Sequence, residues 1–312
     1  MKIGLHDAEL EHIPNKTFPN LALMKISAHH KAKGDTVEWY IPLLSNTYDL
    51  VYTSSVFDFT PKKAKDYFPP NTIYGGTGYG LYGKENDLPQ EIDEMFPDYS
   101  IYPQCDYAIG FLTRGCINKC KFCVVPKKEG MIRPYSTVEQ IARKDTKEIH
   151  FMDNNVLACN YGIEQLKYLA TTDYIVDFNQ GLDITLVTEE IVQILAKIKW
   201  KRFIRFSCDK EYQVPHFARV VELFKKYKIA PSKMFVYVLI QKDLDNADRR
   251  VQALVSMDRN LNLYAQAERN ELLGIRPNKA QLEFAQRYVY GRLYKKETWK
   301  EYCQRINFTT VD

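Results

Sequence analysis

Three cysteines lie close together in the middle of the chain, at C-x3-C-x2-C spacing. They are Cys116, Cys120 and Cys123, and Gly115 directly precedes the first of them. Clustered thiolates are soft ligands that select zinc, copper(I) or an iron–sulfur cluster. A structural zinc site usually closes with four protein ligands, often as two separated pairs. No second pair is present here, so a zinc site would have to borrow Cys105, Cys159 or a histidine. On a four-iron, four-sulfur cluster, three cysteines leave one iron open to another ligand.

The motif also places an aromatic residue, Phe122, directly before the last cysteine. This arrangement resembles the signature of the radical S-adenosylmethionine (radical SAM) superfamily. The flanks are similar to the subgroup that contains the cobalamin-dependent radical SAM enzymes and the tRNA methylthiotransferases. These flanks are Thr113–Cys116, Cys123–Pro126, Glu129–Gly130 and Arg133. The resemblance covers roughly residues 105–300, at about 30 residues for each βα unit.

The resemblance implies a [4Fe–4S] cluster held by Cys116, Cys120 and Cys123, with S-adenosyl-L-methionine (SAM) on the open iron. An external one-electron donor, flavodoxin-like or ferredoxin-like, would reduce the cluster. SAM would then split into methionine and a 5′-deoxyadenosyl radical that abstracts a hydrogen atom from the substrate. The cofactor carries the hard step, and the protein holds, orients and shields it. The substrate is not identified by the sequence, so a nucleoside, a peptide and a small metabolite all remain open.

The elements that must position this site follow a regular rhythm of strand and helix. Apolar runs predict six strands, at residues 107–112, 148–152, 174–178, 202–207, 234–240 and 261–265. Between them, amphipathic patterns and caps predict five helices; Ser136 with Glu139 is a capping-box signal, and Thr188 is a candidate N-cap. The predicted fold class is therefore α/β. By the resemblance, it is a partial (β/α)6 radical SAM barrel over residues 101–278, followed by a C-terminal helical segment over residues 279–312.

Catalytic residues of parallel α/β barrels lie just past the strand ends. By the resemblance, Asp153, Asn154 and Asn155 stand where relatives contact the amino group of SAM, and the backbone of Phe122 where they touch adenine. Gln180 and Ser207 stand where polar residues hold the ribose and carboxylate. The other polar residues at the strand ends are Asn179, Asp183, Cys208, Asp209, Gln266 and Glu268. Helix caps and turns are the alternative role for each, because Asp, Asn and Ser favour helix starts.

Residues 1–100 predict a small Rossmann-like domain of alternating strands and helices. It is similar to a cobalamin-binding domain, but it is short and lacks the D-x-H-x-x-G pattern that would supply a histidine ligand. We therefore expect a reduced domain without cobalamin.

Residues 78–83 match the glycine-rich pattern G-x-G-x-x-G of dinucleotide-binding sites. A polar run and Pro89 follow instead of a helix, so we expect a glycine-rich turn rather than a nucleotide site.

Composition places the chain among ordinary globular enzymes. Its 312 residues are 45% hydrophobic and 26% charged, and the net charge of +4 is too small to indicate nucleic-acid binding, which remains possible. Neither a signal peptide nor an apolar run long enough for a membrane span is present. Seven cysteines in a chain of this length do not suggest a disulfide framework, so we expect a cytoplasmic protein without a membrane partner.

Two other classes of function remain open at this point. The first is a non-catalytic zinc or iron–sulfur module that acts as a scaffold or nucleic-acid adaptor. The second is a cobalamin-using methyltransferase. Cys159 and Cys208 could donate a hydrogen atom to a substrate radical or bind a second cluster, and Cys105 could be an accessory ligand, although a free cysteine is more often a small buried hydrophobe.

Overall fold

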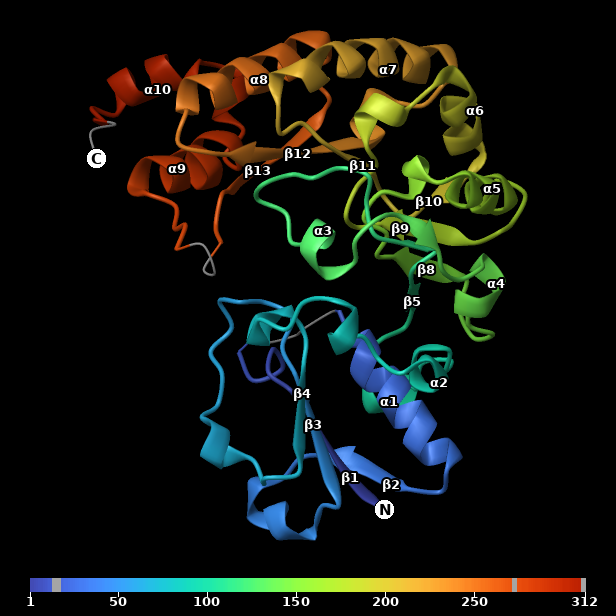
Figure 1. Cartoon of the computed structure of the whole chain (residues 1–312). Coiled ribbons are helices and arrows are strands. Elements are labelled where there is room, and N and C mark those ends of the chain that lie inside the picture. Colours follow the sequence, from blue (N-terminus) through green and yellow to red (C-terminus); the bar gives the residue numbers. More distant parts are fainter. Residues whose placement is uncertain (13–17, 271–273, 310–312) are drawn as a thin grey trace. The chain divides into compact units, whose positions relative to one another are not determined.

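The structure is a computed structural model that describes residues 1–12, 18–270 and 274–309. The chain forms two units (Figure 1). Unit 1 contains Met1–Ile109 and Val124–Gly130, and unit 2 contains Gly110–Cys123 and Met131–Asp312. The chain therefore passes from one unit to the other three times, and the second passage follows Cys123 directly. The boundaries predicted near residues 100 and 278 stay predictions.

Unit 1 is built on a parallel four-stranded sheet with the strand order β2-β1-β3-β4. Its strands are β1 (Lys2–Asp7), β2 (Thr36–Trp39), β3 (Leu50–Ser54) and β4 (Thr72–Gly75). Its helices are α1 (Leu21–Ala32), α2 (Gln90–Asp93) and the short α3 (Val125–Lys128). The sheet and the one long helix match the predicted Rossmann-like pattern.

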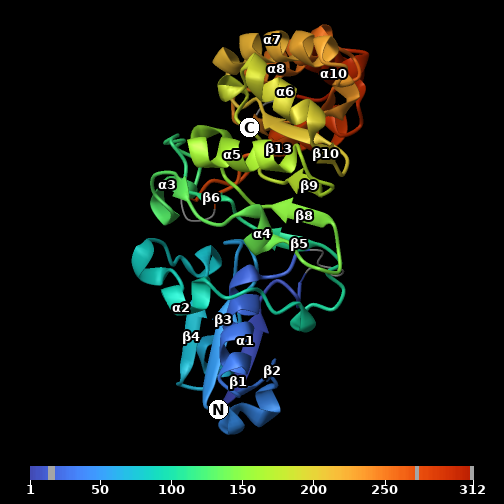
Figure 2. The ribbon, with the colours of Figure 1, turned by 90° about the vertical axis from the view of Figure 1, so that its right-hand side faces the viewer.

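Helix α1 lies against this sheet (Figure 2). It packs there because Leu23 and Ile26 of the helix form one buried cluster with Ile3 and Leu5 of β1. Asn20 caps the helix by accepting a hydrogen bond from the backbone N–H of Leu23.

The glycine-rich run after β4 forms turns, as predicted. Short 3-10 turns at Thr77–Tyr79 and Lys84–Asn86 take the place of the helix that a dinucleotide site requires. A side chain at Gly78 would place its Cβ 2.2 Å from the hydroxyl of Ser55, so close packing against the β3 loop explains this glycine.

Unit 2 contains two parallel sheets and a short ribbon. The sheet orders are β10-β9-β8-β5 and β11-β12-β13, and the ribbon pairs β6 with β7 in antiparallel fashion. The strands are β5 (Ala108–Gly110), where the chain enters unit 2, and β6 (Thr113–Arg114), β7 (Arg133–Pro134), β8 (Glu148–Phe151), β9 (Ile175–Phe178), β10 (Lys199–Trp200), β11 (Ile204–Ser207), β12 (Met234–Ile240) and β13 (Asn262–Ala267). Each of the six predicted strands has a counterpart here. A parallel bridge between Leu182 and Phe206 connects the two sheets.

In the described part of unit 2, the helices first alternate with these strands, and the last helices follow β13 (Figure 1). They are α4 (Val138–Ile141), α5 (Asn160–Leu169), α6 (Glu189–Lys197), α7 (Val214–Lys226), α8 (Leu244–Met257), α9 (Lys279–Glu283) and α10 (Trp299–Arg305). Thr188 caps α6 as predicted, by accepting a hydrogen bond from the N–H of Ile191 at 3.2 Å. The α/β class with parallel sheets is confirmed.

One local prediction was wrong. The capping box of α4 uses Thr137 and Gln140, one residue later than the predicted Ser136 and Glu139. The C-terminal segment consists of several helical pieces: after α9 the chain forms a π-helical stretch, and Arg292 then adopts a positive φ of 58°. An L residue in this left-handed conformation ends a helix, so α10 begins as a separate element.

Candidate functional site

The three cysteines lie on a loop of unit 2 whose entrance is held by several contacts. The loop follows β6, which pairs with β7 through Thr113↔Pro134 and Arg114↔Arg133. The guanidinium of Arg114 lies 4.2 Å from the ring centre of Phe111 and 5.3 Å from that of Tyr135. Gly115 has φ of 87°, which turns the chain sharply into Cys116.

The cysteine sulfurs share one electrostatic environment. Cys120 is exposed, whereas Cys116 and Cys123 are partly buried. Desolvation raises the pKa of the Cys120 thiol, and the neighbouring Cys116 sulfur raises it further, followed by the carboxylates of Asp209 and Asp183. Binding to metal would have to offset this rise, because a metal ligand must be a thiolate.

Backbone geometry shapes the loop between the cysteines. The N–H of Asn118 donates to the sulfur of Cys116 at 3.3 Å, and the N–H of Cys123 donates to the carbonyl of Cys120 at 3.0 Å. The second bond closes a tight turn that brings the last two cysteines of the motif together. Phe122 lies inside this turn and is partly buried.

Asp183 connects the cysteine loop to the ends of two parallel strands. One oxygen of its carboxylate accepts from the side-chain amides of Asn118, at 2.9 Å, and Asn155, at 3.3 Å. The other oxygen accepts from the N–H and hydroxyl of Thr185. Since Asn155 follows β8 and Asp183 follows β9, the loop lies over the carboxyl ends of these strands, where chemistry is expected in parallel α/β folds.

Asn155 carries an unsatisfied buried acceptor at this place. The residue is 2% exposed, and its Oδ1 has no hydrogen-bond partner among the described residues. Its amide nitrogen points to the carboxylate of Asp183 and to the sulfur of Cys116, 3.6 Å away. Because the nitrogen must face the carboxylate, the oxygen is the free acceptor. A buried acceptor without a partner is costly, and a bound N–H donor would relieve that cost.

Asp153, predicted to contact SAM, directs its carboxylate toward the base of the cysteine loop. It accepts from the N–H of Leu112 at 3.0 Å and from the N–H and hydroxyl of Thr113, at 2.6 and 2.7 Å. The side chain is fully buried, and this burial raises its pKa to about 6, against the lowering effect of the three hydrogen bonds. In this structure Asp153 positions the loop entrance; its direct contact with SAM stays a prediction.

The other predicted SAM contacts, apart from Phe122, also follow or end strands of unit 2. Asn154 is partly buried between Asp153 and Asn155, and Gln180 is exposed in the turn after β9. Ser207 ends β11 and hydrogen-bonds the carboxylate of Asp209. Contact of these three residues with SAM stays a prediction.

The sequence analysis did not identify some polar residues at the ends of β11 and β12. The Nζ of Lys210 lies 3.3 Å from Oε1 of Gln241, whose amide nitrogen lies 3.1 Å from Oε2 of Glu268. The charge of Lys210 lowers the pKa of the Cys120 thiol, against the larger raising effects of desolvation and of the Cys116 sulfur. Gln241 directly follows β12, so the strand-end rule itself, applied to every strand, would have found it.

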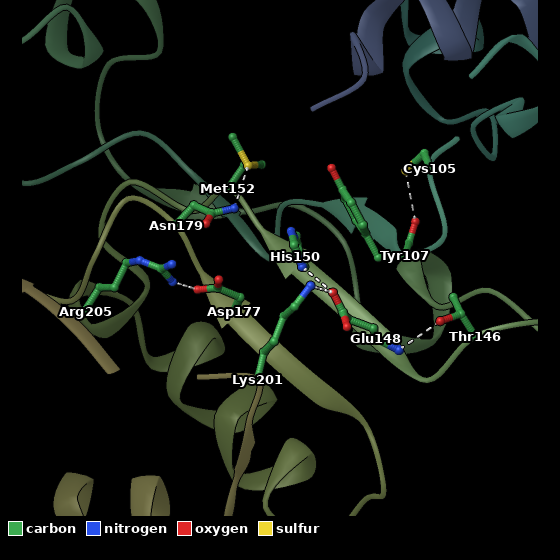
Figure 3. Close-up of polar contacts among 10 residues, drawn as sticks. All are labelled: Cys105, Tyr107, Thr146, Glu148, His150, Met152, Asp177, Asn179, Lys201 and Arg205. Carbon is green, nitrogen blue, oxygen red and sulfur yellow. Dashed lines mark hydrogen bonds and ion pairs between the residues drawn. The ribbon is translucent and has the colours of Figure 1, made fainter. Parts of the chain in front are cut away.

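Three other cysteines were candidates for a chemical role in the sequence: Cys105, Cys159 and Cys208. Cys208 is fully buried, and desolvation raises the pKa of its thiol to about 12, which keeps it protonated. Cys105 belongs to unit 1, is buried, and donates to the carbonyl of Tyr107 (Figure 3). Cys159 directly precedes α5 and is partly buried. None of the seven cysteines, all of which lie in described ranges, forms a disulfide.

The donor set of the loop is three cysteines, whose thiolates are soft ligands of the kind that bind iron–sulfur clusters or zinc. Within the described ranges, no group of three His, Cys, Asp or Glu side chains is placed to hold a metal ion. The fit of this loop to a cluster therefore rests on the chemistry of its cysteines.

No helix in the described part of the chain has the length and apolar character needed to cross a bilayer.

Comparison with known proteins gives a structural neighbour only. No protein-family model matches the chain, and no curated protein matches its sequence. Among solved structures, it is similar to the cobalamin-dependent S-adenosylmethionine radical enzyme OxsB, determined with aqua-cobalamin bound. The TM-score is 0.54 and the identity is 12%, over 95% of this chain and 56% of the other. The chain thus spans little more than half the length of this neighbour, and the likeness supports a radical SAM-like fold.

Proposed function

We propose that this protein is a radical SAM enzyme. In this proposal Cys116, Cys120 and Cys123 hold one [4Fe–4S] cluster, and SAM is its second cofactor. The main support for the proposal is a pair of hydrogen bonds, in which Asn118 and Asn155 both donate to the carboxylate of Asp183. These bonds hold the cysteine loop over the ends of parallel strands, beside the unsatisfied Oδ1 of Asn155. The likeness in fold to a radical SAM enzyme supports the same conclusion.

The residues of this chain would bind and orient the cofactors. Oδ1 of Asn155 would accept a hydrogen bond from the ammonium group of SAM, while Asp183 holds the Asn155 amide in that orientation. Asp153 would keep the loop entrance in place through Leu112 and Thr113. Further contacts with SAM are proposed for Phe122, Asn154, Gln180 and Ser207.

When bound, the cluster would pass one electron to SAM, which would yield methionine and a 5′-deoxyadenosyl radical that takes a hydrogen atom from the substrate. The electron would come from a flavodoxin-like or ferredoxin-like donor. Such chemistry requires reduced thiolates at the cluster, so we propose a cytoplasmic setting. The substrate and the final product remain to be assigned.

We also propose that the two parallel sheets of unit 2 are two arcs of one partial barrel. The Leu182–Phe206 bridge supports this proposal, as does the N–H of Leu182, which donates to the carbonyl of Arg205 at 2.7 Å. In this arrangement the strands follow one another in chain order, from β5 through β8, β9, β11 and β12 to β13.

The proposal is tested on anaerobically purified full-length protein after reconstitution with iron and sulfide. Iron and sulfide contents near four per chain, a brown chromophore and 5′-deoxyadenosine formed from SAM and dithionite are the expected results. The variant Cys120→Ala should lose 5′-deoxyadenosine formation, whereas the matched control Cys159→Ala should keep it. A Cys120→Ala protein that remained fully active and iron-replete would contradict the proposal. Colourless protein with one bound zinc would instead support the scaffold or adaptor module.

A corrinoid-using enzyme is the second candidate, because the structural neighbour was determined with aqua-cobalamin. In unit 1, however, the carboxyl edge of the sheet is occupied by its own side chains. Nδ1 of His6 lies 2.8 Å from the hydroxyl of Thr53, which in turn lies 3.0 Å from the hydroxyl of Tyr79. We therefore keep the expectation that cobalamin is not used. Incubation with hydroxocobalamin followed by gel filtration distinguishes the candidates, since a retained corrinoid spectrum would favour the second.

A further inference from the structure

One face of the β11-β12-β13 sheet carries side chains that are only partly buried. Along β12, buried and partly buried residues alternate strictly. The buried set, such as Val236 and Val238, faces the helices, so the other set lies on the opposite face. We call that opposite face the inner face; its residues are Arg205, Ser207, Phe235, Tyr237, Leu239, Asn262, Tyr264 and Gln266.

Three rings form a continuous aromatic surface there, which we call the platform: Phe235, Tyr237 and Tyr264. The ring centres of Phe235 and Tyr264 are 6.0 Å apart with an interplanar angle of 27°, a nearly parallel arrangement. Tyr237 stands edge-on to both, at 5.1 Å from Phe235 and 6.0 Å from Tyr264. Tyr264 is 40% exposed, so a ring remains accessible in a cluster that otherwise supports it.

The charge beside the platform is compensated within the protein. The guanidinium of Arg205 lies 5.7 Å from the ring centre of Phe235 and is paired with the buried carboxylate of Asp177 (Figure 3). Next to it, the imidazole of His150 is hydrogen-bonded to Glu148, and desolvation lowers its pKa, so it is neutral near pH 7. Since Arg205 is engaged by Asp177, this surface favours an uncharged group over a phosphate or a carboxylate.

Amide side chains flank the platform. Gln266 lies two residues after Tyr264 on the same face of β13 and is exposed. Asn179 directly follows β9; its backbone carbonyl accepts from the hydroxyl of Tyr237 at 3.3 Å, and its side-chain nitrogen lies 3.8 Å from the weak acceptor Sδ of Met152 (Figure 3). An amide beside an aromatic surface offers both a donor and an acceptor, which matches the edge of a nitrogen heterocycle.

The platform and the cysteine loop are both connected to the turn after β9. The hydroxyl of Tyr237 donates to the carbonyl of Asn179 at 3.3 Å, and Asn179 directly follows β9. In the same turn, Asp183 accepts a hydrogen bond from Asn118 of the cysteine loop at 2.9 Å. A group lying on the platform is therefore connected, through this turn, with the loop proposed to hold the cluster.

We infer that the platform binds the substrate through a neutral, planar nitrogen heterocycle of the nucleobase type. The ring would stack on Tyr264, and the amides of Gln266 and Asn179 would meet its polar edge. This inference deepens the proposed function and rests on it, because it assigns a substrate class to that reaction. Stacking on aromatic side chains tolerates different bases, so the edge contacts would decide which base is preferred.

The test measures binding of defined probes to the reconstituted full chain with SAM at saturation, so that the adenine of SAM does not compete. The probes are guanosine, uridine and a single-stranded hexaribonucleotide, with free ribose as the probe without a ring. Saturation-transfer NMR reports which protons touch the protein, and equilibrium dialysis gives the dissociation constants. Tyr264→Leu removes the ring, Tyr264→Phe keeps it, and Tyr168→Leu removes a tyrosine of similar exposure, 38%, from α5.

We expect transfer to the base protons of at least one nucleoside and none to ribose. Tyr264→Leu should weaken that binding by about tenfold, whereas Tyr264→Phe and Tyr168→Leu should leave it unchanged. Gln266→Leu, which leaves the rings in place, should change the preference between guanosine and uridine. Comparable affinity for the free nucleoside would identify a nucleoside substrate, and much tighter hexanucleotide binding with the same dependence on Tyr264 would identify a base within RNA.

The inference is overturned if none of the probes with a ring binds, or if Tyr264→Leu binds them as well as the wild type. A loss of SAM affinity in Tyr264→Leu, without loss of probe binding, would also overturn it, because the platform would then serve the adenine of SAM. Formation of 5′-deoxyadenosine is measured in parallel on the wild type. Its absence counts against the proposed function, while probe binding is read independently of it.

Discussion

At the scale of single residues, the site shows two neighbouring polar side chains with different tasks. Asp153 and Asn155 are both almost completely buried after β8, and both were predicted to meet SAM. The carboxylate of Asp153 has three donors from the protein, whereas the carbonyl oxygen of Asn155 has none among the described residues. Both residues follow the same strand, two positions apart, so their places in the sequence do not distinguish them. The difference depends on the direction of each side chain, which the spacing of residues along the chain does not predict.

Replacement of Asn155 by leucine should lower the affinity for SAM by about tenfold, because one hydrogen bond to a charged donor is lost. The cysteine ligands are untouched, so iron content should stay at the wild-type level. Isothermal titration with SAM on reconstituted protein measures the affinity. Asn160→Leu, at an exposed asparagine that begins α5, is the matched control. Unchanged SAM affinity in Asn155→Leu would remove the role proposed for its Oδ1.

Asp153 should make stability depend on pH in a definite direction. Burial raises its folded pKa to about 6, above the ordinary value of 3.8. The folded state therefore binds a proton more readily than the unfolded state. This contribution to stability is fully present below the ordinary pKa and is lost as the pH rises through about 6.

Consequently, the wild type should gain stability relative to Asp153→Asn when the pH falls from 7 to 5, by at most about 1.4 kcal/mol per pH unit. Urea unfolding at several pH values measures the difference. The control is Asp145→Asn, an exposed carboxylate whose pKa is lowered mainly by its hydrogen bond with Arg143. A difference between wild type and Asp153→Asn that does not vary with pH would show that burial does not shift this group.

At the scale of elements, the sequence pattern predicted the strands well because their burial alternates or is continuous. The strand β12 has the strict two-residue period, and the predicted range of residues 234–240 is the observed one. The α4 cap was ambiguous, since Ser136 and Thr137 are each followed three residues later by an acid or amide. Only packing distinguishes them: Thr137 places Val138 and Ile141 of α4 in the core.

Long-range hydrogen bonds between elements could not be predicted in the same way. Arg250 of α8 is 2% exposed, and it donates to the carbonyls of Cys208 and Leu239 at the ends of β11 and β12. From the sequence pattern of the helix, an exposed charge is predicted at this position, because lone arginines are rarely buried. The buried guanidinium satisfies two carbonyls that the sheet leaves open, next to Asp209.

Arg250→Met should therefore reduce the free energy of unfolding by about 2–4 kcal/mol, because it leaves buried carbonyls without donors. The neighbouring Arg249 is the matched control, since its ion pair with Glu211 is exposed to solvent. Arg249→Met should change the free energy of unfolding by less than about 1 kcal/mol. Chemical denaturation of both variants measures the contrast; equal losses would contradict a specific role of Arg250.

At the scale of the whole molecule, cofactor binding should stabilise the unit that contains the cysteines. A ligand that binds only the native state adds stability that grows with the logarithm of the ratio of its free concentration to its dissociation constant. Cys116, Cys120 and Cys123 all belong to unit 2. Calorimetry of iron-loaded and chelator-treated protein should therefore show an upward shift in one melting transition upon loading. The same comparison on the variant with all three cysteines replaced by alanine should show no shift; a shift there would place the iron elsewhere.

The route of the chain between the units has a consequence for any attempt to divide the protein. After Cys123 the backbone leaves unit 2, and residues 124–130 lie in unit 1, where the ammonium of Lys127 lies 4.5 Å from the ring centre of Tyr82. A single cut between Ile109 and Gly110 would therefore leave residues 124–130 on the fragment that contains unit 2 and separate them from the rest of unit 1. A gene fragment that begins at Gly110 would encode a seven-residue segment deprived of its packing partners, one peptide bond away from a proposed iron ligand.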